Sequence, residues 1–173
     1  MYVSLLNEYR IRLAQEQDLR AALEMKLLAW RQAYSGFRDE EFFAYHEAQL
    51  EQQLAWWERG LAGGAQFWIA ESGDGKIIGL AGGTPTIEED QDTGVDIELG
   101  VLYVLEEFYG GGLGAHLMDT VLGQRDALVW VLAGNERAVA FYRKHGFVPD
   151  GTSEELVGSW AGLREVRMVR RHG

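Results

Sequence analysis

The segment 109–118, YGGGLGAHLM, places four glycines ahead of an apolar run with helical spacing. Glycine has no β-carbon, so a phosphate can approach the backbone closely and positive φ angles cost little. A helix that begins after such a loop exposes free backbone N–H groups at the positive end of its dipole. The segment predicts a site for phosphate or pyrophosphate, and a tight strand-to-helix connection is the plain alternative.

Two familiar nucleotide-binding motifs do not fit this loop. A mononucleotide P-loop needs Lys followed by Ser or Thr after its last glycine, and Ala115 and His116 stand there instead. A dinucleotide fingerprint has its loop in the first strand–helix turn and an acidic residue about 20 positions later. Here the loop lies past mid-chain, and residues 127–135, ALVWVLAGN, end without an acid.

Apolar segments on both sides of the loop must position it. Residues 97–105, IELGVLYVL, and 127–133, ALVWVLA, predict buried strands. Leu113, Leu117 and Val121 share a helical face between them, and a glycine at 123 stands where that helix would end. The pattern is strand, glycine loop, helix, strand.

The last third of the chain continues with one helix and two strands. Asn135 can cap a helix that His145 and Gly146 end. Residues 151–158 and 164–171 predict two closing antiparallel strands.

The first half predicts a strand, two helices and a hairpin. Residues 10–14 alternate as a half-buried strand does, and Asp18 is the expected N-cap of the first helix. A second helix begins near Asp39 and runs to the glycines at 63 and 64. A hairpin turns at Gly-Asp-Gly, and the acidic residues 88–96, EEDQDTGVD, predict a solvated loop.

Composition limits the classes of function. The chain has 173 residues, 47% of them hydrophobic, no cysteine and a net charge of −11. One domain over residues 1–173 is the expectation, without disulfides or thiolate metal sites, and the absence of cysteine fits a cytoplasmic protein. The acidic balance argues against nucleic acid and anionic membranes, and neither a leader sequence nor a membrane span is visible.

Two blocks of the sequence resemble one family. The block LYVLEEFYGGGLGAHLM, followed about 20 residues later by VLAGNERAVAFYRKHGFVPDG, is similar to the acetyl-CoA site of the GNAT N-acetyltransferase superfamily. The second block is the more specific, with Asn135, Ala138, Phe141–Tyr142 and Gly146–Phe147 at the family's spacing. The family's loop usually opens with Gln or Arg, where this chain has Tyr109, and often follows a Pro that is missing here.

The resemblance implies an α+β fold of three layers. The expected GNAT-like sheet is mixed and mostly antiparallel, is flanked by helices, and is splayed between its fourth and fifth strands. The resemblance also implies acetyl-CoA as co-substrate. The cofactor-binding residues that it implies are Leu102, Tyr103, Val104, Tyr109, Gly110, Gly111, Gly112, Leu113, Gly114, Ala115, Asn135, Ala138, Phe141 and Tyr142.

Two catalytic residues follow from the same resemblance. Tyr142 would protonate the departing CoA thiolate as general acid, with core packing as its alternative. Glu98 would take the proton of the amine as general base, because side chains alternate along a strand and would turn Glu98 toward a cleft. An exposed carboxylate at a strand end is the alternative for Glu98. The four histidines lack the close pairing of a metal site, so no metal is expected.

The expected activity is direct acetyl transfer to a primary amine of a small molecule or peptide. An acyl-CoA-binding sensor without turnover and a nucleotide-binding module remain as alternatives, and a homodimer stays open. In this family the acceptor pocket comes from the early helices and the late loops, where aromatic residues are dense. These aromatic residues either line a pocket or fill a core; they are Trp30, Tyr34, Phe37, Phe42, Phe43, Trp56 and Trp57.

Overall fold

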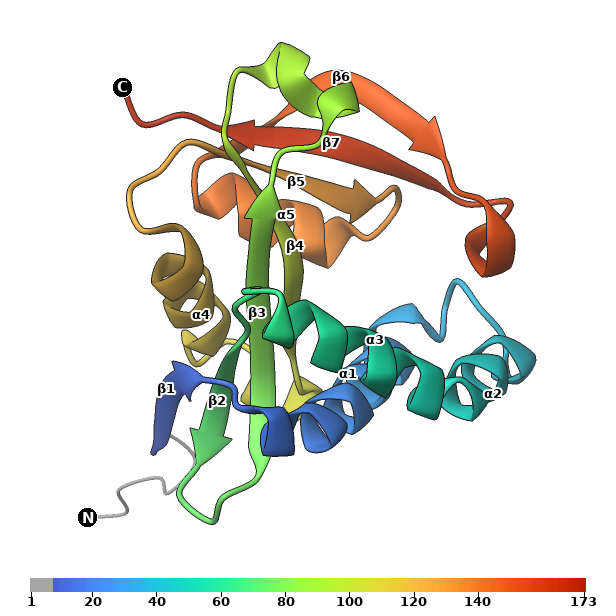
Figure 1. Cartoon of the computed structure of the whole chain (residues 1–173). Coiled ribbons are helices and arrows are strands. Elements are labelled where there is room, and N and C mark those ends of the chain that lie inside the picture. The colour runs from blue at the N-terminus through green and yellow to red at the C-terminus, as the bar shows by residue number, and fades with distance from the viewer. Residues whose placement is uncertain (1–7) are drawn as a thin grey trace. The chain divides into compact units, whose positions relative to one another are not determined.

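The computed structural model describes residues 8–173, so residues 1–7 of the segment inspected for a leader sequence lie outside it. Within this range seven strands form one open, mostly antiparallel sheet in the order β1-β2-β3-β4-β5-β7-β6, with flanking helices (Figure 1). The fold class expected from the sequence is confirmed. The chain divides into two compact units, a first unit of Met1–Gly82 with Val101–Val121 and a second of Gly83–Gly100 with Leu122–Gly173.

Antiparallel strands form the sheet portion of the first unit. β1 (Tyr9–Leu13) pairs with β2 (Trp68–Ser72), and β2 pairs with β3 (Ile77–Pro85). The turn between β2 and β3 places Gly75 at φ 86°, where glycine is favoured over residues with a β-carbon. The predicted hairpin is therefore confirmed.

Three helices follow β1 in the first unit. They are α1 (Leu19–Tyr34), α2 (Glu40–Ala48) and α3 (Leu50–Ala62). Asp39 caps α2 by accepting a hydrogen bond from Phe42 N at 3.1 Å, as expected. The single long helix predicted after Asp39 is wrong, because the chain turns at Gln49, whose φ of −91° and ψ of 6° are not helical.

Asp18 does not cap α1 with its side chain. Its carboxylate accepts hydrogen bonds from the Arg12 guanidinium at 2.7 and 2.9 Å and from Gln15 N at 2.8 Å. The sequence-based prediction missed this ion pair, which the short helix η2 (Glu16–Asp18) brings together. Asp18 therefore links β1 to the start of α1.

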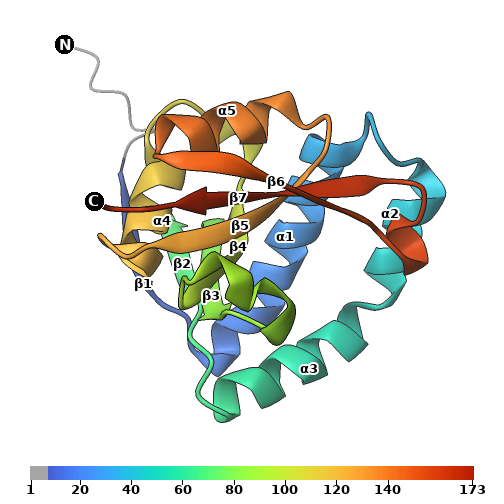
Figure 2. The same ribbon diagram turned by 90° about the horizontal axis from the view of Figure 1, so that it is seen from above.

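The helix after the glycine loop packs closely on the first unit's sheet. β4 (Ile97–Val104) is followed by η4 (Glu106–Phe108) and then by α4 (Leu113–Leu122). A β-carbon built on Gly79 of β3 would lie 2.7 Å from Leu117 Cδ1, so only glycine allows this approach. In Figure 2, α4 and α1 lie on opposite sides of β2 and β3.

The second unit contains β5 (Ala127–Leu132), α5 (Glu136–Lys144), β6 (Phe147–Glu155), η5 (Gly158–Trp160) and β7 (Arg164–Arg170). β7 pairs antiparallel with β5 and β6. β4 and β5 form the parallel pair, through Glu98 and Leu128. The β6 strand begins four residues earlier than the 151–158 strand expected from the sequence.

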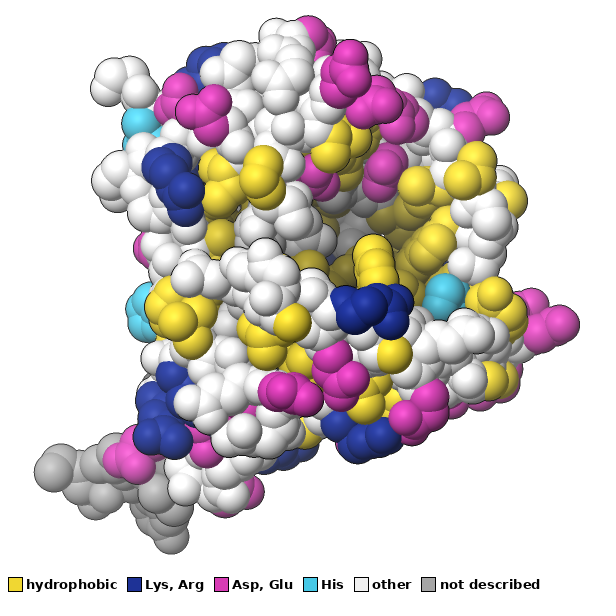
Figure 3. Space-filling model, viewed as in Figure 1, with side chains coloured by type: hydrophobic (Ala, Val, Ile, Leu, Met, Phe, Trp, Pro, Cys, Tyr) yellow, Lys and Arg dark blue, Asp and Glu magenta, His cyan; other side chains and the backbone are white. Residues whose placement is uncertain are grey.

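The acidic segment of the second unit is not the solvated loop that the sequence predicted. It forms a 3₁₀ helix, η3 (Glu88–Thr93), in which Asp90 and Thr93 are buried. Other acidic side chains of this region remain at the surface, and Figure 3 shows Asp and Glu gathered over η3. The prediction failed because Arg167, the residue that neutralises Asp90, is distant from it in the sequence.

Candidate functional site

The glycine loop has the backbone that a phosphate site needs. Gly110 and Gly112 have φ angles of 76° and 86°, a region that residues with a β-carbon rarely adopt. A β-carbon built at either position would meet nothing within 4 Å. The first turn of α4 is closed by a bond from His116 N to Gly112 O at 3.0 Å, so the amides before His116 face out of the helix end.

Buried contacts on either side hold the loop in place. Leu113 and Leu117 of α4 are buried, at 1% and 0% exposure. Before the loop, Glu106 N donates to Gln32 Oε1 of α1 at 2.8 Å, and Tyr109 N donates to Glu106 O at 3.0 Å. The loop is thus an ordered element between η4 and α4.

His116 lies on the surface of α4, as the sequence suggested. Its Nδ1 contacts the Tyr9 hydroxyl of β1. Burial raises the pKa of Tyr9 above its ordinary value.

The end of β4 carries the residues expected beside the cofactor arm. Leu102, Tyr103 and Val104 are all partly buried. The Tyr103 ring lies 6.3 Å from the Trp30 ring of α1. Burial raises the pKa of Tyr103, and hydrogen bonding with Trp30 acts in the opposite direction. The strand end therefore adjoins α1 in the first unit.

Asn135 is the N-cap of α5. Its Oδ1 accepts a hydrogen bond from Ala138 N at 3.2 Å, which confirms the capping role expected from the sequence. The cofactor role of Asn135 and Ala138 stays a prediction.

Tyr142 is a buried aromatic residue of α5. Its ring packs edge-on against Phe141 at 5.2 Å and Phe147 at 5.4 Å. Phe141 in turn packs against His145 at 4.6 Å. The packing fixes the orientation of the Tyr142 ring. This environment fits both the predicted role as general acid and the alternative role in core packing.

Glu98 is a partly buried carboxyl group of β4. Burial raises its pKa, and the nearby charge of Asp90 raises it further. A carboxylate with a raised pKa is better suited to accept a proton near neutral pH. The role of Glu98 as general base stays a prediction.

Glu98 and Tyr142 come from opposite faces of the second unit's strands. Glu98 pairs with Leu128, whose face also carries Val169. Tyr142 contacts Phe147, which pairs with Arg170 on the other face of β7. Figure 2 shows α5 and η3 on different sides of β5 and β7. The structure thus places the two predicted catalytic residues on different faces of these strands, and their roles stay predictions.

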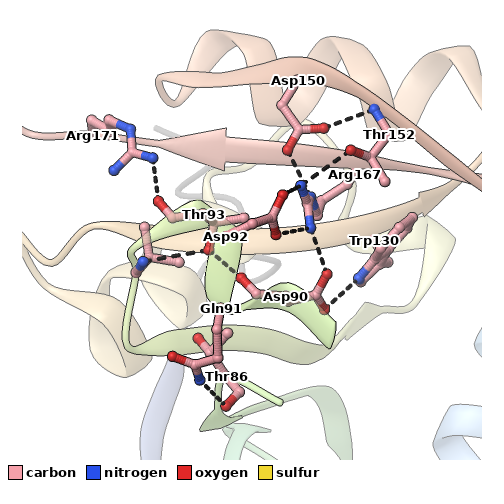
Figure 4. A network of polar contacts seen from close by, with 11 residues as sticks. Thr86, Asp90, Gln91, Asp92, Thr93, Trp130, Asp150, Thr152, Arg167 and Arg171 are labelled. Carbon is pink, nitrogen blue, oxygen red and sulfur yellow. Dashed lines mark hydrogen bonds and ion pairs between the residues drawn. The ribbon is translucent and has the colours of Figure 1, made fainter. Parts of the chain in front are cut away.

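A buried ion-pair network, which the sequence analysis missed, occupies the Glu98 face (Figure 4). Arg167 of β7 binds Asp90 at 2.8 Å, Asp92 at 2.8 Å and Asp150 at 2.6 Å. Asp90 also accepts a hydrogen bond from Trp130 Nε1 at 3.0 Å. The network, referred to below as the Arg167 network, fixes η3 to β5 and β7. The sequence showed only that basic and apolar residues alternate along residues 164–171, which does not reveal the network.

A second carboxyl group shares this environment. The pKa of Glu165 on β7 is raised by burial and by the charges of Glu154, Glu98 and Asp90. Glu154 stands directly opposite Glu165 in the β6–β7 pair. Glu165 was not predicted, because an acid in a basic strand looks like a surface residue.

A cavity of about 550 Å³ lies beside the Arg167 network. It contains none of the site residues predicted from the sequence. Its lining residues are Asp92, Thr93, Gly146, Val148, Pro149, Asp150, Thr152, Arg167, Val169 and Arg171.

The aromatic residues expected at an acceptor pocket are divided between core and surface. Trp30, Phe42, Phe43 and Trp57 are buried, whereas Trp56 is 68% exposed. Lys26 of α1 places its Nζ 4.5 Å from the centre of the Trp30 ring. The indole rings of Trp30 on α1 and Trp57 on α3 therefore lie beside a basic group.

Metal and membrane features were sought within residues 8–173. In that range no group of three or more His, Cys, Asp and Glu side chains is arranged to hold a metal ion. No helix of the same residues is long and apolar enough to cross a membrane.

Comparisons with known proteins agree on one family. The family model described as an acetyltransferase (GNAT) domain matches residues 63–149. An uncharacterized N-acetyltransferase of Mycobacterium tuberculosis is 39% identical over 92 residues, which are 50% of this chain and 55% of that protein. The chain thus spans about half the length of the curated relatives it matches.

Solved structures share the fold. The PaiA N-acetyltransferase of Thermoplasma acidophilum, in complex with coenzyme A, has a TM-score of 0.67 at 20% identity over 95% of this chain and 99% of that chain. The putative acetyltransferase YncA of Salmonella typhimurium, with acetyl-CoA, has a TM-score of 0.66 at 20% identity over 96% and 97%. Since the family model covers half of its residues, the chain belongs to the GNAT acetyltransferase family.

Proposed function

We propose that this chain is a single GNAT domain that transfers the acetyl group of acetyl-CoA directly to a primary amine of a small molecule or peptide. Two structural neighbours are complexes with coenzyme A and with acetyl-CoA, which supports the choice of co-substrate. Direct transfer needs neither a metal nor a covalent enzyme intermediate.

The observation that carries the proposal is the glycine loop. Gly110 and Gly112 have positive φ angles and face open space, and the amides at the start of α4 point out of the helix. A pyrophosphate would accept hydrogen bonds from these amides and gain from the helix dipole. The loop thus fits the diphosphate of CoA, with Leu102 to Val104 offering backbone groups to the rest of the cofactor arm.

The second unit supplies the proposed proton-transfer groups. Acetyl-CoA brings an acetyl thioester, which is the group that an amine attacks. Glu98 accepts the proton that the amine nitrogen loses as the new N–C bond forms. Tyr142 donates its phenolic proton to the sulfur as the C–S bond breaks, and it regains a proton from solvent. The products are an N-acetyl amine and free CoA thiol.

Thiol release from acetyl-CoA, measured over a panel of primary amines, tests the proposal. We expect release that depends on one class of amine and is matched by an equal amount of N-acetyl product in mass spectrometry. If no amine causes release of the CoA thiol, but CoA still raises the melting temperature, the acyl-CoA sensor would be supported instead. Stabilisation by ATP or NAD as strong as by CoA would favour a nucleotide-binding module.

A further inference from the structure

Lys26 is a basic residue in aromatic surroundings. Its Nζ lies 4.5 Å from the centre of the Trp30 ring and 5.5 Å from that of Trp57. Ring faces attract a cation, but they do not neutralise it. The name Lys26 cluster is used here for Lys26 with Trp30 and Trp57, for His46 and Tyr103 beside Trp30, and for Gln53 one turn before Trp57 on α3.

No carboxylate of residues 8–173 forms an ion pair or hydrogen bond with Lys26. Burial lowers the pKa of Lys26 to about 8, so the ammonium stays mostly charged at neutral pH. The pKa of His46 is lowered by burial and by the charge of Lys26. A partly desolvated positive charge therefore lacks a counter-ion in this part of the molecule.

Gln53 adds a second polar group without a partner. Its Oε1 is buried and accepts no hydrogen bond within the described chain. Gln53 lies four residues before Trp57 on α3, so both side chains project from one face of the helix. A buried acceptor of this kind is satisfied when a donor is brought in by another molecule.

The Lys26 cluster adjoins the strand assigned to the cofactor arm. Trp30 lies 6.3 Å from the ring of Tyr103, the middle residue of Leu102 to Val104. Trp30 is also 5.2 Å from His46, and Phe42 is 4.5 Å from His46. A molecule seated on these rings would lie next to the end of β4 in the first unit.

We propose that Lys26 binds the carboxylate of the acetyl acceptor, and that the acceptor is an amino-acid-like molecule with a primary amine, a carboxylate and an apolar side chain. The inference deepens the proposed function and rests on it. The carboxylate supplies the missing counter-ion, the apolar side chain packs against the partly exposed rings of His46 and Tyr103, and Gln53 accepts a hydrogen bond from the ligand.

Matched pairs of amines test the inference by binding alone. Calorimetric titrations in the presence of CoA would compare tryptophan with tryptamine, phenylalanine with phenethylamine, and leucine with 3-methylbutylamine. Each pair differs only in the carboxylate. The variants are Lys26→Met, which keeps an unbranched apolar stem, and Lys144→Met, the same change at an exposed residue near the end of α5.

The expected result is at least a tenfold preference for the carboxylate member of one or more pairs in the parent and in Lys144→Met. The preference should fall to threefold or less in Lys26→Met. Equal affinity for both members of every pair in the parent, or an undiminished preference in Lys26→Met, overturns the inference.

A spectroscopic titration covers the case in which Lys26→Met does not fold. The chain has three lysines, so ¹³C-labelled lysine gives few signals to assign. Binding of the carboxylate probe should raise the pKa of Lys26 above its value of about 8, and an unchanged pKa at saturation overturns the inference. The proposed function fails separately, through absence of a CoA-induced melting shift in the parent protein.

Discussion

The Arg167 side chain of the second unit and the Lys26 side chain of the first unit differ in how their positive charges are neutralised. In the second unit the Arg167 side chain, 4% exposed, binds three carboxylates, and Asp90 among them is 3% exposed. In the first unit Lys26 faces two indole rings and pairs with no carboxylate of residues 8–173, and the glycine loop faces open space. A buried charge that is paired with other side chains of the chain stabilises the fold. A charge or a backbone amide without such a partner is available to a ligand. From this difference we propose a stabilising role for the Arg167 network of the second unit and ligand binding for the first unit.

The largest expected effect is on stability, from Arg167→Met. Removing one member of a buried ion pair leaves an uncompensated charge, here Asp90, and costs about 3–5 kcal/mol. Urea unfolding of the parent and the variant measures the loss. Arg164→Met is the control, because Arg164 pairs with Glu155 at the surface and should contribute no more than about 1 kcal/mol. A loss as small as the control's would mean that the Arg167 network is not the scaffold.

The next effect is on turnover, from Tyr142→Phe. The ring and its packing against Phe141 and Phe147 remain, but the proton donor is lost, so kcat should fall by roughly 10²-fold or more. Steady-state kinetics with an acceptor identified in the amine panel measure it, with Tyr45→Phe at an exposed position of α2 as control. A kcat near that of the parent would mean that Tyr142 only packs in the core and that solvent protonates the CoA thiolate.

Glu98→Gln should act on the pH dependence. The raised pKa of Glu98 places the acidic limb of kcat/KM for the amine above the pH at which an ordinary glutamate titrates. The variant should lower kcat/KM by about tenfold or more and flatten that limb. Glu155→Gln, at an exposed carboxylate, provides the comparison. If the acidic limb persists in Glu98→Gln, another carboxyl group acts as the base. Glu165 would be the first to test.

A smaller effect concerns Lys26 and the pH dependence of stability. The folded-state pKa of Lys26 is about 8, below its ordinary value of 10.5. Between these values the unfolded chain binds more protons than the folded chain, so stability gains a rising contribution as pH increases. Unfolding free energies of the parent relative to Lys26→Met should therefore increase from pH 8 to about pH 10. A flat difference would mean that the ammonium is well solvated.

Structural features that depend on neighbouring residues could be predicted from the sequence. The glycines before α4, the Asp39 and Asn135 caps and the hairpin turn at Gly75 depend on neighbouring residues, and a sequence shows neighbours directly. The proposed site residues in these elements came from the family resemblance, and their roles stay predictions. The fold class followed from a family resemblance carried by the two blocks around the glycine loop and α5.

Partners distant in sequence made the rest unpredictable. Asp90 was expected in a solvated loop, because its partner Arg167 comes 77 positions later. Asp18 was expected as a cap, and Arg12 binds its carboxylate instead. Lys26 attracted no attention, because a lysine on a helix usually lies in solvent, and only the packing of α3 places Trp57 beside it.

The central claim is that the glycine loop of the first unit holds the CoA pyrophosphate, and a pair of substitutions tests it most directly. Gly112 and Gly75 have the same φ of 86°, so Gly112→Ala and Gly75→Ala both place alanine at the same unfavourable φ. Titrating CoA against melting temperature should show Gly75→Ala binding like the parent and Gly112→Ala at least tenfold more weakly, because its methyl group enters the space of the phosphate. Equal CoA affinity in all three proteins would contradict the account and leave the loop as a connection between β4 and α4.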